Sequence, residues 1–274
     1  MNRRRDFRIR EALVPLAVLA RQRVALWQFL VRAISRRYRV SAFGFLWVLI
    51  VPLVTLGIYT FVFGSVMQSR WDTGTSELPF SLQLFAGLIV FWLMADAMAQ
   101  APTCIVEHAN LVKKAVFPLE IIPAVVVGAA LFHTLINTAI LLAATALLAH
   151  VPATAVLFPL VLVPFVILLI GSAWILAALG VYFRDMAHMM TLILTALLFL
   201  SPVFYPLTRL SPALQSIVVF NPVAFIVIQS RRVLLEGKMP DWTGLAIYLI
   251  AAWVIASLGF IFFRKARRTF ADVL

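Results

Sequence analysis

Few side chains in this 274-residue sequence could carry out chemistry, and their spacing argues against catalysis. No cysteine–histidine cluster has the spacing of a metal site, and a chain with one cysteine cannot form an internal disulfide. No G-x-x-x-x-G-K-S/T loop is present to bind nucleotide phosphates, and no serine or cysteine lies in a nucleophile motif. We therefore predict a protein that is not an enzyme and has no cofactor, metal or ATPase of its own.

Two ionisable side chains, Asp96 and His133, lie among apolar residues. Ionisable groups inside a membrane usually mark function. Asp96 is the one charged residue in stretch 78–100, but it lies near the end of that stretch, and the apolar stretches offer it no basic partner. We interpret Asp96 as a structural or boundary residue and His133 as a packed polar group.

The composition is that of an integral membrane protein. Hydrophobic residues make up 64% of the chain and charged residues 12%, whereas a soluble domain has about 25% charged residues. About 20 apolar residues cross a bilayer as a helix, and a helix satisfies its own backbone there. We predict an all-α protein with six transmembrane helices near 45–67, 80–100, two within 121–183 that separate at 150–155, 187–207 and 242–263.

The basic residues orient these spans. With six spans both termini share one side, and the segments on that side (1–44, 101–120, 182–189 and 264–274) hold 18 of the 23 Lys and Arg residues. The opposite side holds 5. Segments rich in Lys and Arg stay in the cytoplasm, so we predict that both termini are cytoplasmic. The net charge of +12 then serves orientation and anchoring to lipid, and we expect no nucleic-acid partner.

A further apolar run, within 210–235, is interpreted as a re-entrant pair of short helices between spans five and six. Asn221-Pro222 divides the run into halves of about ten residues, each too short to cross alone. A seventh span would place RKARR (264–268) outside, against the charge distribution. We therefore predict that this hairpin enters the membrane from the outer side and returns to it.

The N-terminal segment 1–40 is predicted to be cytoplasmic and to contain an amphipathic helix. Between 21 and 39 the arginines fall near one helical face, and leucines and an isoleucine lie on another. This pattern is typical of a helix that lies on the inner membrane surface. Residues 1–20 imitate a signal peptide, with arginines before a short apolar run, but we expect them to be retained.

Between spans two and three lies a short charged segment, EHANLVKK (107–114). Its acidic start and basic end suit the dipole of a short helix. Phe117-Pro118 would stop that helix, and Pro123 would open the next span. A rigid short helix at the ends of two long ones would act as a lever, because force applied to it moves both spans. The simpler alternative is a basic loop that only fixes orientation.

Six motifs in a fixed order carry a resemblance to a known family. They are RYRVSAFGFLWVLIVPL (37–53), NLVKKAVFPLEIIP (110–123), VYFRD (181–185), PVFYP (202–206), Asn221-Pro222 and FADVL (270–274). With them the whole chain resembles the transmembrane subunit of a bacterial ABC transporter that exports lipid-linked polysaccharide, O-antigen or capsule.

The resemblance implies a homodimer in the bacterial inner membrane, with two copies of a separate ABC ATPase that binds ATP and Mg. It implies an interface helix within 1–40, a six-span domain over 41–263, and a basic cytoplasmic tail over 264–274. Within the six-span domain, about 107–118 would be the coupling helix and about 210–235 the periplasmic gate hairpin. Further partners would be the lipid-linked polysaccharide, membrane lipids, and periplasmic or outer-membrane export proteins.

The resemblance also gives roles to individual residues. Contact with the ATPase would fall to Glu107, Asn110, Leu111, Lys113, Lys114, Phe117, Pro118, Arg184 and Asp185. Asn221 and Pro222 would belong to the gate. Separately from the family, an anionic lipid anchor on the substrate would require basic residues near the cytoplasmic side, and Arg37 and Arg39, just before span one, are the candidates; anchoring to lipid headgroups explains them equally well.

Aromatic rings that pack on the C–H faces of sugars could hold a sliding polymer loosely. Phe45, Pro52, Tyr59 and Phe63 recur along span one as one stripe. The predicted channel residues are Phe45, Tyr59, Phe63, Phe199, Phe204 and Tyr205. The alternative for each ring is packing or contact with lipid.

Three other functions stay open at this point. An ion-coupled secondary transporter should show inverted repeats and buried ionisable residues, and the sequence has no clear repeat. An ABC exporter of another lipid-linked polymer, such as teichoic acid, fits the same motifs. A membrane scaffold without transport is the third alternative.

The predicted topology can be tested by thiol labelling in a Cys104→Ser background. A cysteine in place of Met239 should react with an impermeant thiol reagent from outside intact cells, because the charge distribution places 208–241 there. A cysteine in place of Ala271 should react only after permeabilisation. Labelling of the Ala271 position in intact cells would show a seventh span and contradict the hairpin.

Overall fold

The computed structural model describes residues 15–38, 43–66, 79–112, 117–207, 211, 213, 215, 218 and 221–274. Within these ranges the regular elements are all helices. The α-helices are α2 (Pro15–Arg21), α3 (Arg23–Tyr38), α4 (Trp47–Tyr59), α5 (Phe80–Gln100), α6 (Ala109–Val112), α7 (Ile121–Leu148), α8 (Phe158–Tyr182), α9 (Met186–Leu200), α11 (Pro222–Leu234), α12 (Trp242–Ala266) and α13 (Phe270–Val273). Short tighter or wider turns extend several of them: 3₁₀ turns at Gly44–Leu46, Val106–His108, Ala153–Leu157 and Arg267–Thr269, and a π-helix at Thr60–Val66.

Five helical stretches of the described chain are long and apolar enough to cross a membrane. They are Gly44–Phe63, Phe80–Gln100, Ile121–Leu148, Ala153–Tyr182 and Trp242–Val273. The predicted break in 121–183 is confirmed, because α7 ends at Leu148 and the next helical turn begins at Ala153.

The prediction of a helix through residue 207 is wrong. α9 is a 15-residue apolar helix that ends at Leu200, and residues 201–207 form turns. Pro202 and Pro206 follow within six residues, and proline cannot continue the hydrogen-bonding of a helix. The total of six spans therefore stays a prediction.

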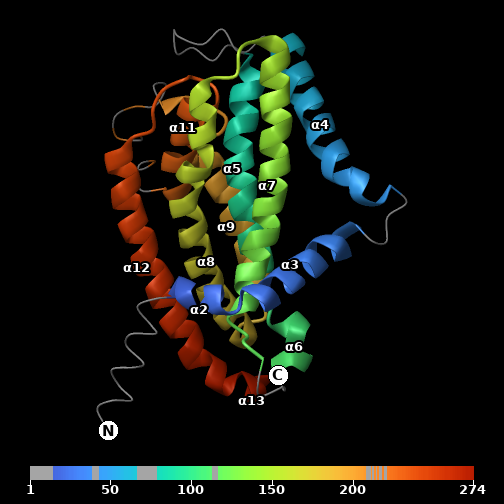
Figure 1. Ribbon diagram of the computed structural model, residues 1–274, viewed down its shortest axis with the longest axis vertical. Coiled ribbons are helices and arrows are strands. Elements are labelled where there is room, and N and C mark those ends of the chain that lie inside the picture. Colours follow the sequence, from blue (N-terminus) through green and yellow to red (C-terminus); the bar gives the residue numbers. More distant parts are fainter. Residues whose placement is uncertain are drawn as a thin grey trace.

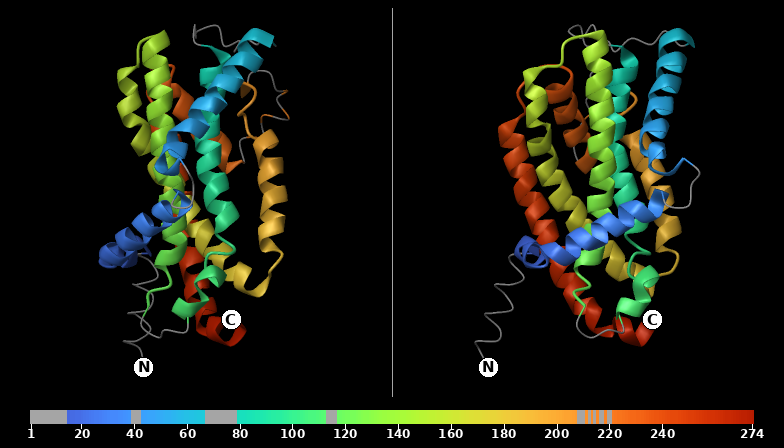
Figure 2. Two further views of the ribbon diagram at one scale, coloured as in Figure 1. Left: turned by 90° about the vertical axis from the view of Figure 1, so that its right-hand side faces the viewer. Right: turned by 45° about the vertical axis from the view of Figure 1, so that its right-hand side comes forward.

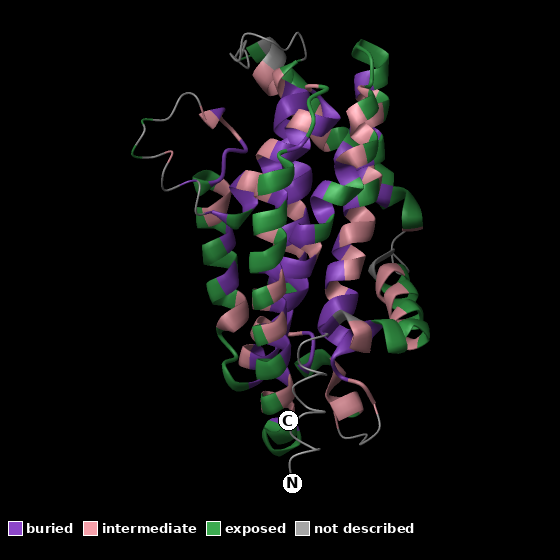
Figure 3. Cartoon of the chain, turned by 60° about the vertical axis from the view of Figure 1, so that its left-hand side comes forward, coloured by how far each residue is buried: buried purple, intermediate pink, exposed green. Residues whose placement is uncertain are grey.

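The long helices form an upright bundle (Figure 1). α12 packs along α8, α5 packs along α7, and α3 lies across α7. α5 is the central helix, because 78% of the residues in its most apolar part are buried. The stretch that contains α4 lies at the edge of the bundle, and only 17% of the residues in its most apolar part are buried. Figure 3 shows that buried positions concentrate on the inner helices. We call the end that carries α6 and α13 the α6 end, and the end that carries α11 the α11 end (Figures 1 and 2).

Small residues allow α8 and α12 to touch closely. A Cβ atom built on Gly171 of α8 would lie 2.5 Å from the Cα atom of Ala256, and Gly259 faces the backbone of Gly171 in the same way. In a membrane, helices gain little by moving apolar side chains out of lipid, so they associate mainly by close packing. Small residues favour this because they let the two backbones approach each other. The two helices therefore form one packed unit.

At the α11 end a buried arginine ties three segments together. The guanidinium of Arg231, whose residue is 4% exposed, donates hydrogen bonds to the carbonyl oxygens of Gln83 (2.9 Å), Pro202 (2.6 Å) and Val203 (2.7 Å). Thr154 donates to the carbonyl of Val233 at 2.7 Å. α11 is thereby fixed to α5, to the turn after α9 and to the start of α8. It is the second half of the predicted hairpin; most of the first half lies outside the described residues.

Gly171→Val should destabilise the protein, because the added side chain meets the backbone of α12. Over-packing of a tight contact costs about 1–3 kcal/mol, which thermal unfolding of the detergent-purified protein will show as a lower midpoint. Gly57→Ala is the matched control, since a Cβ atom there meets nothing within 4 Å of this chain. An unchanged midpoint for Gly171→Val would contradict the close α8–α12 contact.

Candidate functional site

The candidate site is the segment that joins α5 to α7 at the α6 end. After α5, residues 101–105 form turns, Val106–His108 form a 3₁₀ turn, and α6 follows at once. Phe117 and Pro118 are not helical, and α7 begins at Ile121. The helical character predicted for 107–112 is present, and Lys113 and Lys114 lie outside the described residues.

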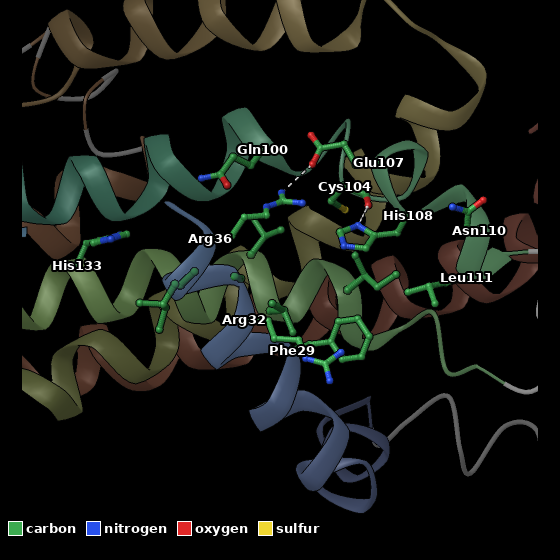
Figure 4. A pocket seen from close by; sticks show the side chains of 16 residues that line it. Phe29, Arg32, Arg36, Gln100, Cys104, Glu107, His108, Asn110, Leu111 and His133 are labelled. Atoms are coloured by element: carbon green, nitrogen blue, oxygen red, sulfur yellow. Dashed lines mark hydrogen bonds and ion pairs between the residues drawn. The ribbon is translucent and has the colours of Figure 1, made fainter. Parts of the chain in front are cut away.

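Glu107 is held from two sides. It accepts a hydrogen bond from the hydroxyl of Thr103 at 2.9 Å and pairs with Arg36 of α3 at 3.3 Å. The Arg36 side chain is 72% exposed, so the ion pair contributes at most about 1 kcal/mol to folding stability. Its main effect is to orient the Glu107 side chain toward α3. One turn along, the His108 ring hydrogen-bonds the carbonyl of Cys104 at 2.8 Å (Figure 4). The segment therefore keeps a fixed orientation toward α3.

A pocket of about 810 Å³ lies between α3, this segment and α7. Figure 4 shows Arg32 and Arg36 entering it from α3, Glu107, His108 and Asn110 from the segment, and His133 at the far end. Apolar side chains of α7 form the remaining wall. Cys104 also lines the pocket, where burial and then the charge of Glu107 raise the pKa of its thiol, so the thiol stays protonated and unreactive.

The second half of the segment, Phe117–Glu120, is a junction of three helices. Arg267 donates to the carboxylate of Glu120 at 2.7 Å and to the carbonyl of Phe117 at 3.0 Å. The indole N–H of the fully buried Trp174 in α8 donates to the carbonyl of Glu120 at 2.9 Å. The Phe117 ring lies 5.1 Å from the Phe29 ring of α3, measured between centroids. α3, α8 and the end of α12 thus all hold the point where the segment enters α7.

The C-terminal residues are anchored beside this junction. The hydroxyl of Tyr182, at the end of α8, donates to the carbonyl of Ala266 at 3.1 Å and lies 2.6 Å from the hydroxyl of Thr269. Phe270 is fully buried, with its ring 5.6 Å from that of Phe263. Arg267 is therefore presented from a fixed turn, which is what a strong pair with Glu120 requires.

The predicted coupling residues fall in two places at the same end. Glu107, Asn110 and Leu111 lie on the segment beside α3. Phe117 and Pro118 lie at the junction. Arg184 and Asp185 are exposed in the turn between α8 and α9. Their role in coupling stays a prediction.

The predicted channel aromatics do not share one open face. Phe45 is 56% exposed and lies 6.1 Å from the ring of Phe132 in α7. Tyr59 and Phe63 are partly buried and pack against the core of the same chain, with Phe63 5.1 Å from the Phe80 ring. The exposed side of α4 carries Trp47 and aliphatic residues instead, and Phe61 of the following π-helix is also exposed. Their role as a channel lining stays a prediction.

The other predicted aromatics gather after α9. Phe199 is 64% exposed and stacks on Phe204 with centroids 5.9 Å apart, and the Tyr205 hydroxyl donates to the carbonyl of Phe199 at 3.0 Å. Asn221, assigned to the gate, caps α11 through its own side chain and donates to the Ser201 hydroxyl at 2.8 Å.

Pro222 follows as the first residue of α11. For the lipid-anchor pair, the side chain of Arg37 and the whole of Arg39 lie outside the described part of the structure.

Three important residues were missed or misjudged from the sequence. Asp96 is not surrounded by apolar residues alone, because Nδ1 of His133 in α7 lies 3.9 Å from its carboxylate; adjacent helices bring together residues that the sequence separates. Glu120 was not singled out, although its carboxylate organises the junction. Arg231 was counted with a loop but is buried, and the sequence holds no signal that separates it from its half-buried neighbour Arg232.

Arg267→Ala should destabilise the protein, because it leaves the Glu120 carboxylate, whose side chain is 7% exposed, buried without its partner. Loss of one partner from a buried pair costs about 3–5 kcal/mol, and the partial exposure of Arg267 favours the lower end. Glu120→Gln should cost less, since its amide oxygen can still accept a hydrogen bond from Arg267. The control is the adjacent exposed Arg268→Ala, expected within about 0.5 kcal/mol of wild type. Equal thermal midpoints for the Arg267 and Arg268 variants would contradict the junction.

Comparison with known proteins confirms the resemblance found in the sequence. Over 248 residues the chain is 27% identical to the O-antigen export system permease protein RfbA of Myxococcus xanthus, covering 88% of this chain and 92% of that one. It is 25% identical over 241 residues to the protein of that name from Klebsiella pneumoniae (87% and 90%). It is 24% identical over 243 residues to the polysialic acid transport protein KpsM of Escherichia coli (86% and 90%). The family model for ABC-2 type transporters matches residues 24–235, and the chain therefore belongs to the ABC-2 type transporter family of membrane permeases.

Proposed function

We propose that this chain is the permease subunit of an ATP-driven exporter that moves lipid-linked polysaccharide, O-antigen or capsule, across the bacterial inner membrane. The observation that carries the proposal is the similarity along almost the whole chain to permeases named for O-antigen export and polysialic acid transport. A separate ABC ATPase binds and hydrolyses ATP with Mg, because the sequence has no phosphate-binding loop.

In this proposal the α6 end faces the cytoplasm. The predicted cytoplasmic segments hold 18 basic residues against 5 on the other side. α9 is the fifth span and α12 the sixth. α11 then lies at the periplasmic side, where its buried contacts with α5 and α8 supply the protein cover that a re-entrant helix needs.

The segment 101–120 is the main contact with the ATPase. Its exposed residues Val106, Glu107 and Asn110 lie at the α6 end, and the Glu120–Arg267 pair holds the point where the segment enters α7. A push on the segment would reach α5 and α7 through the chain, α8 through Trp174, and α12 through Arg267. The exposed Arg184 and Asp185 offer a second contact at the same end. Two copies of the ATPase act on a homodimer of this chain.

The substrate path and lipid contacts follow from exposure. Only Val48 and Pro52 of α4 and Met190 and Leu194 of α9 are buried, so these two helices are the surfaces by which two protomers enclose a glycan. The exposed Phe199, with the half-buried Phe204 stacked on it, gives sugars a flat surface. α3 lies across the bundle (Figure 1) and serves as an interface helix at the level of lipid headgroups. Arg37 and Arg39 are proposed from the sequence alone to bind the lipid anchor of the substrate.

The proposal is tested in a strain whose own copy of the gene is deleted. The wild-type chain should restore cell-surface glycan, and a variant with alanines over residues 110–114 should not. Because the junction at 117–120 is untouched, the variant should reach normal abundance in the membrane. It should lower export at least about tenfold while the partner's ATP hydrolysis continues, since transmission of force is lost.

The matched control removes charge at the other end. Lys238→Ala removes an exposed charge near the α11 end, where the lysine side chain is 51% exposed, and should export normally. Failure of the wild-type chain to restore surface glycan would contradict the proposed function. Normal export by the 110–114 variant would contradict the role of the segment alone.

A further inference from the structure

A second cavity, of about 410 Å³, lies between α4, α5 and α7. Its volume falls in the range of small-molecule sites, about 300–1,000 Å³. Three helices from stretches long enough to cross a membrane line it, and they contribute the polar Thr55, Asp96, His133 and Asn137 beside the apolar Val48, Val51 and Pro52. Each helix contributes two side chains that could contact a polar or ring-shaped ligand: Trp47 and Thr55 from α4, Trp92 and Asp96 from α5, and His133 and Asn137 from α7.

Asn137 is the residue that points to a ligand. It is 9% exposed and lines the cavity, and its side-chain amide makes no hydrogen bond within the described part of the chain. Its neighbours Thr134 and Thr138 are satisfied, because their hydroxyls donate to the carbonyls of Ala130 (3.0 Å) and Thr134 (2.7 Å). The amide lines the cavity, so its oxygen and N–H groups are available to a ligand that enters it.

The other polar groups define what that ligand is. The Asp96 carboxylate accepts hydrogen bonds, and the His133 ring 3.9 Å away can donate or accept. The Asn137 amide does both. No group of three His, Cys, Asp or Glu residues suited to a metal ion occurs among the described residues, and a carboxylate disfavours a phosphate. Hydroxyl groups, which donate and accept together, match this set.

Two indole rings complete the match. Trp47 and Trp92 line the same cavity, and their flat faces suit the C–H faces of a sugar ring. Thr55 contributes mainly shape, because its hydroxyl already donates to the carbonyl of Val51 at 2.7 Å. His133 also lines the 810 Å³ pocket at the α6 end, so this one side chain borders both cavities.

We propose that this cavity within a single protomer binds one sugar ring of the transported glycan, with Asn137, Asp96 and His133 bonding its hydroxyls and the two tryptophans packing on its faces. The proposal rests on the proposed export function and adds a subsite to it. In this proposal the site holds one sugar inside a protomer, between α4, α5 and α7, before the polymer moves into the space between the two protomers.

The test uses Asn137→Leu, which keeps the volume and removes the amide. Because the variant loses an unsatisfied buried group, its thermal midpoint in detergent, without glycan, should equal or exceed that of wild type. Its export in the deletion strain should fall about fivefold or more, as expected when hydrogen bonds to a ligand are lost. The control is Thr138→Val, a buried neighbour whose hydroxyl has its partner within the helix; it should export normally. A lower midpoint for Asn137→Leu would show a packing role and overturn the proposal.

Binding is measured by thermal shift of the purified full-length protein. The probes are lipid-linked glycan extracted from the host, the same glycan released from its lipid, and host phospholipid alone. Both glycan probes should raise the midpoint of wild type and of Thr138→Val but not that of Asn137→Leu. If phospholipid alone raises the midpoint in a way that depends on Asn137, the cavity binds a lipid headgroup. If neither glycan probe raises the midpoint, the cavity binds only water. Either result overturns the proposal. If wild type exports and Asn137→Leu exports equally, the subsite fails and the export function stands. If wild type itself exports nothing, the proposed function fails.

Discussion

The pairing of Glu120 with Arg267 is the constraint on which the α6 end of this protein depends. A carboxylate with a 7% exposed side chain is stable only if it is paired and hydrogen-bonded. Meeting that need fixes the last turn of α12, and Tyr182 and Phe270 in turn hold this turn against α8. Trp174 closes the arrangement from the backbone side of Glu120. One buried charge and its contacts therefore join three segments that are far apart in the sequence: residues 117–120, α8 and the turn at Arg267–Thr269.

The junction matters because of how the rest of the bundle is packed. α8 and α12 touch through Gly171 and Gly259, with almost no space for independent movement. α5 and α7 are joined covalently by the segment 101–120. A displacement of this segment thus acts on both helix pairs, through the chain on one and through the Glu120–Arg267 pair on the other. In the proposed orientation, segment 101–120 is the part that the ATPase would push, and it is linked to α5 and α7 through the chain and to α12 through the Glu120–Arg267 pair.

Much of the fold follows from local properties of the sequence, and the contacts that organise it do not. Long charge-free runs predict helices long enough for a membrane, and the small residues with Pro152 predict the break after α7. The end of α9 was misplaced, because Pro202 and Pro206 outweigh the apolar residues around them. Glu120 and Arg267 are 147 positions apart, and Asp96 and His133 lie on different helices. Hydrophobic pattern carries no information about which polar residues meet, so neither pair was predicted.

The account is tested most directly by reconstituting the chain with its partner ATPase in vesicles and measuring movement of lipid-linked glycan between leaflets. A glycosidase added outside would report which glycans are accessible before and after ATP. The account predicts transfer away from the cytoplasmic leaflet that requires ATP hydrolysis, persists when the proton gradient is collapsed, and is absent without this chain. Transfer that continues without ATP and stops when the gradient is collapsed would contradict it, because the chain would then be a secondary transporter.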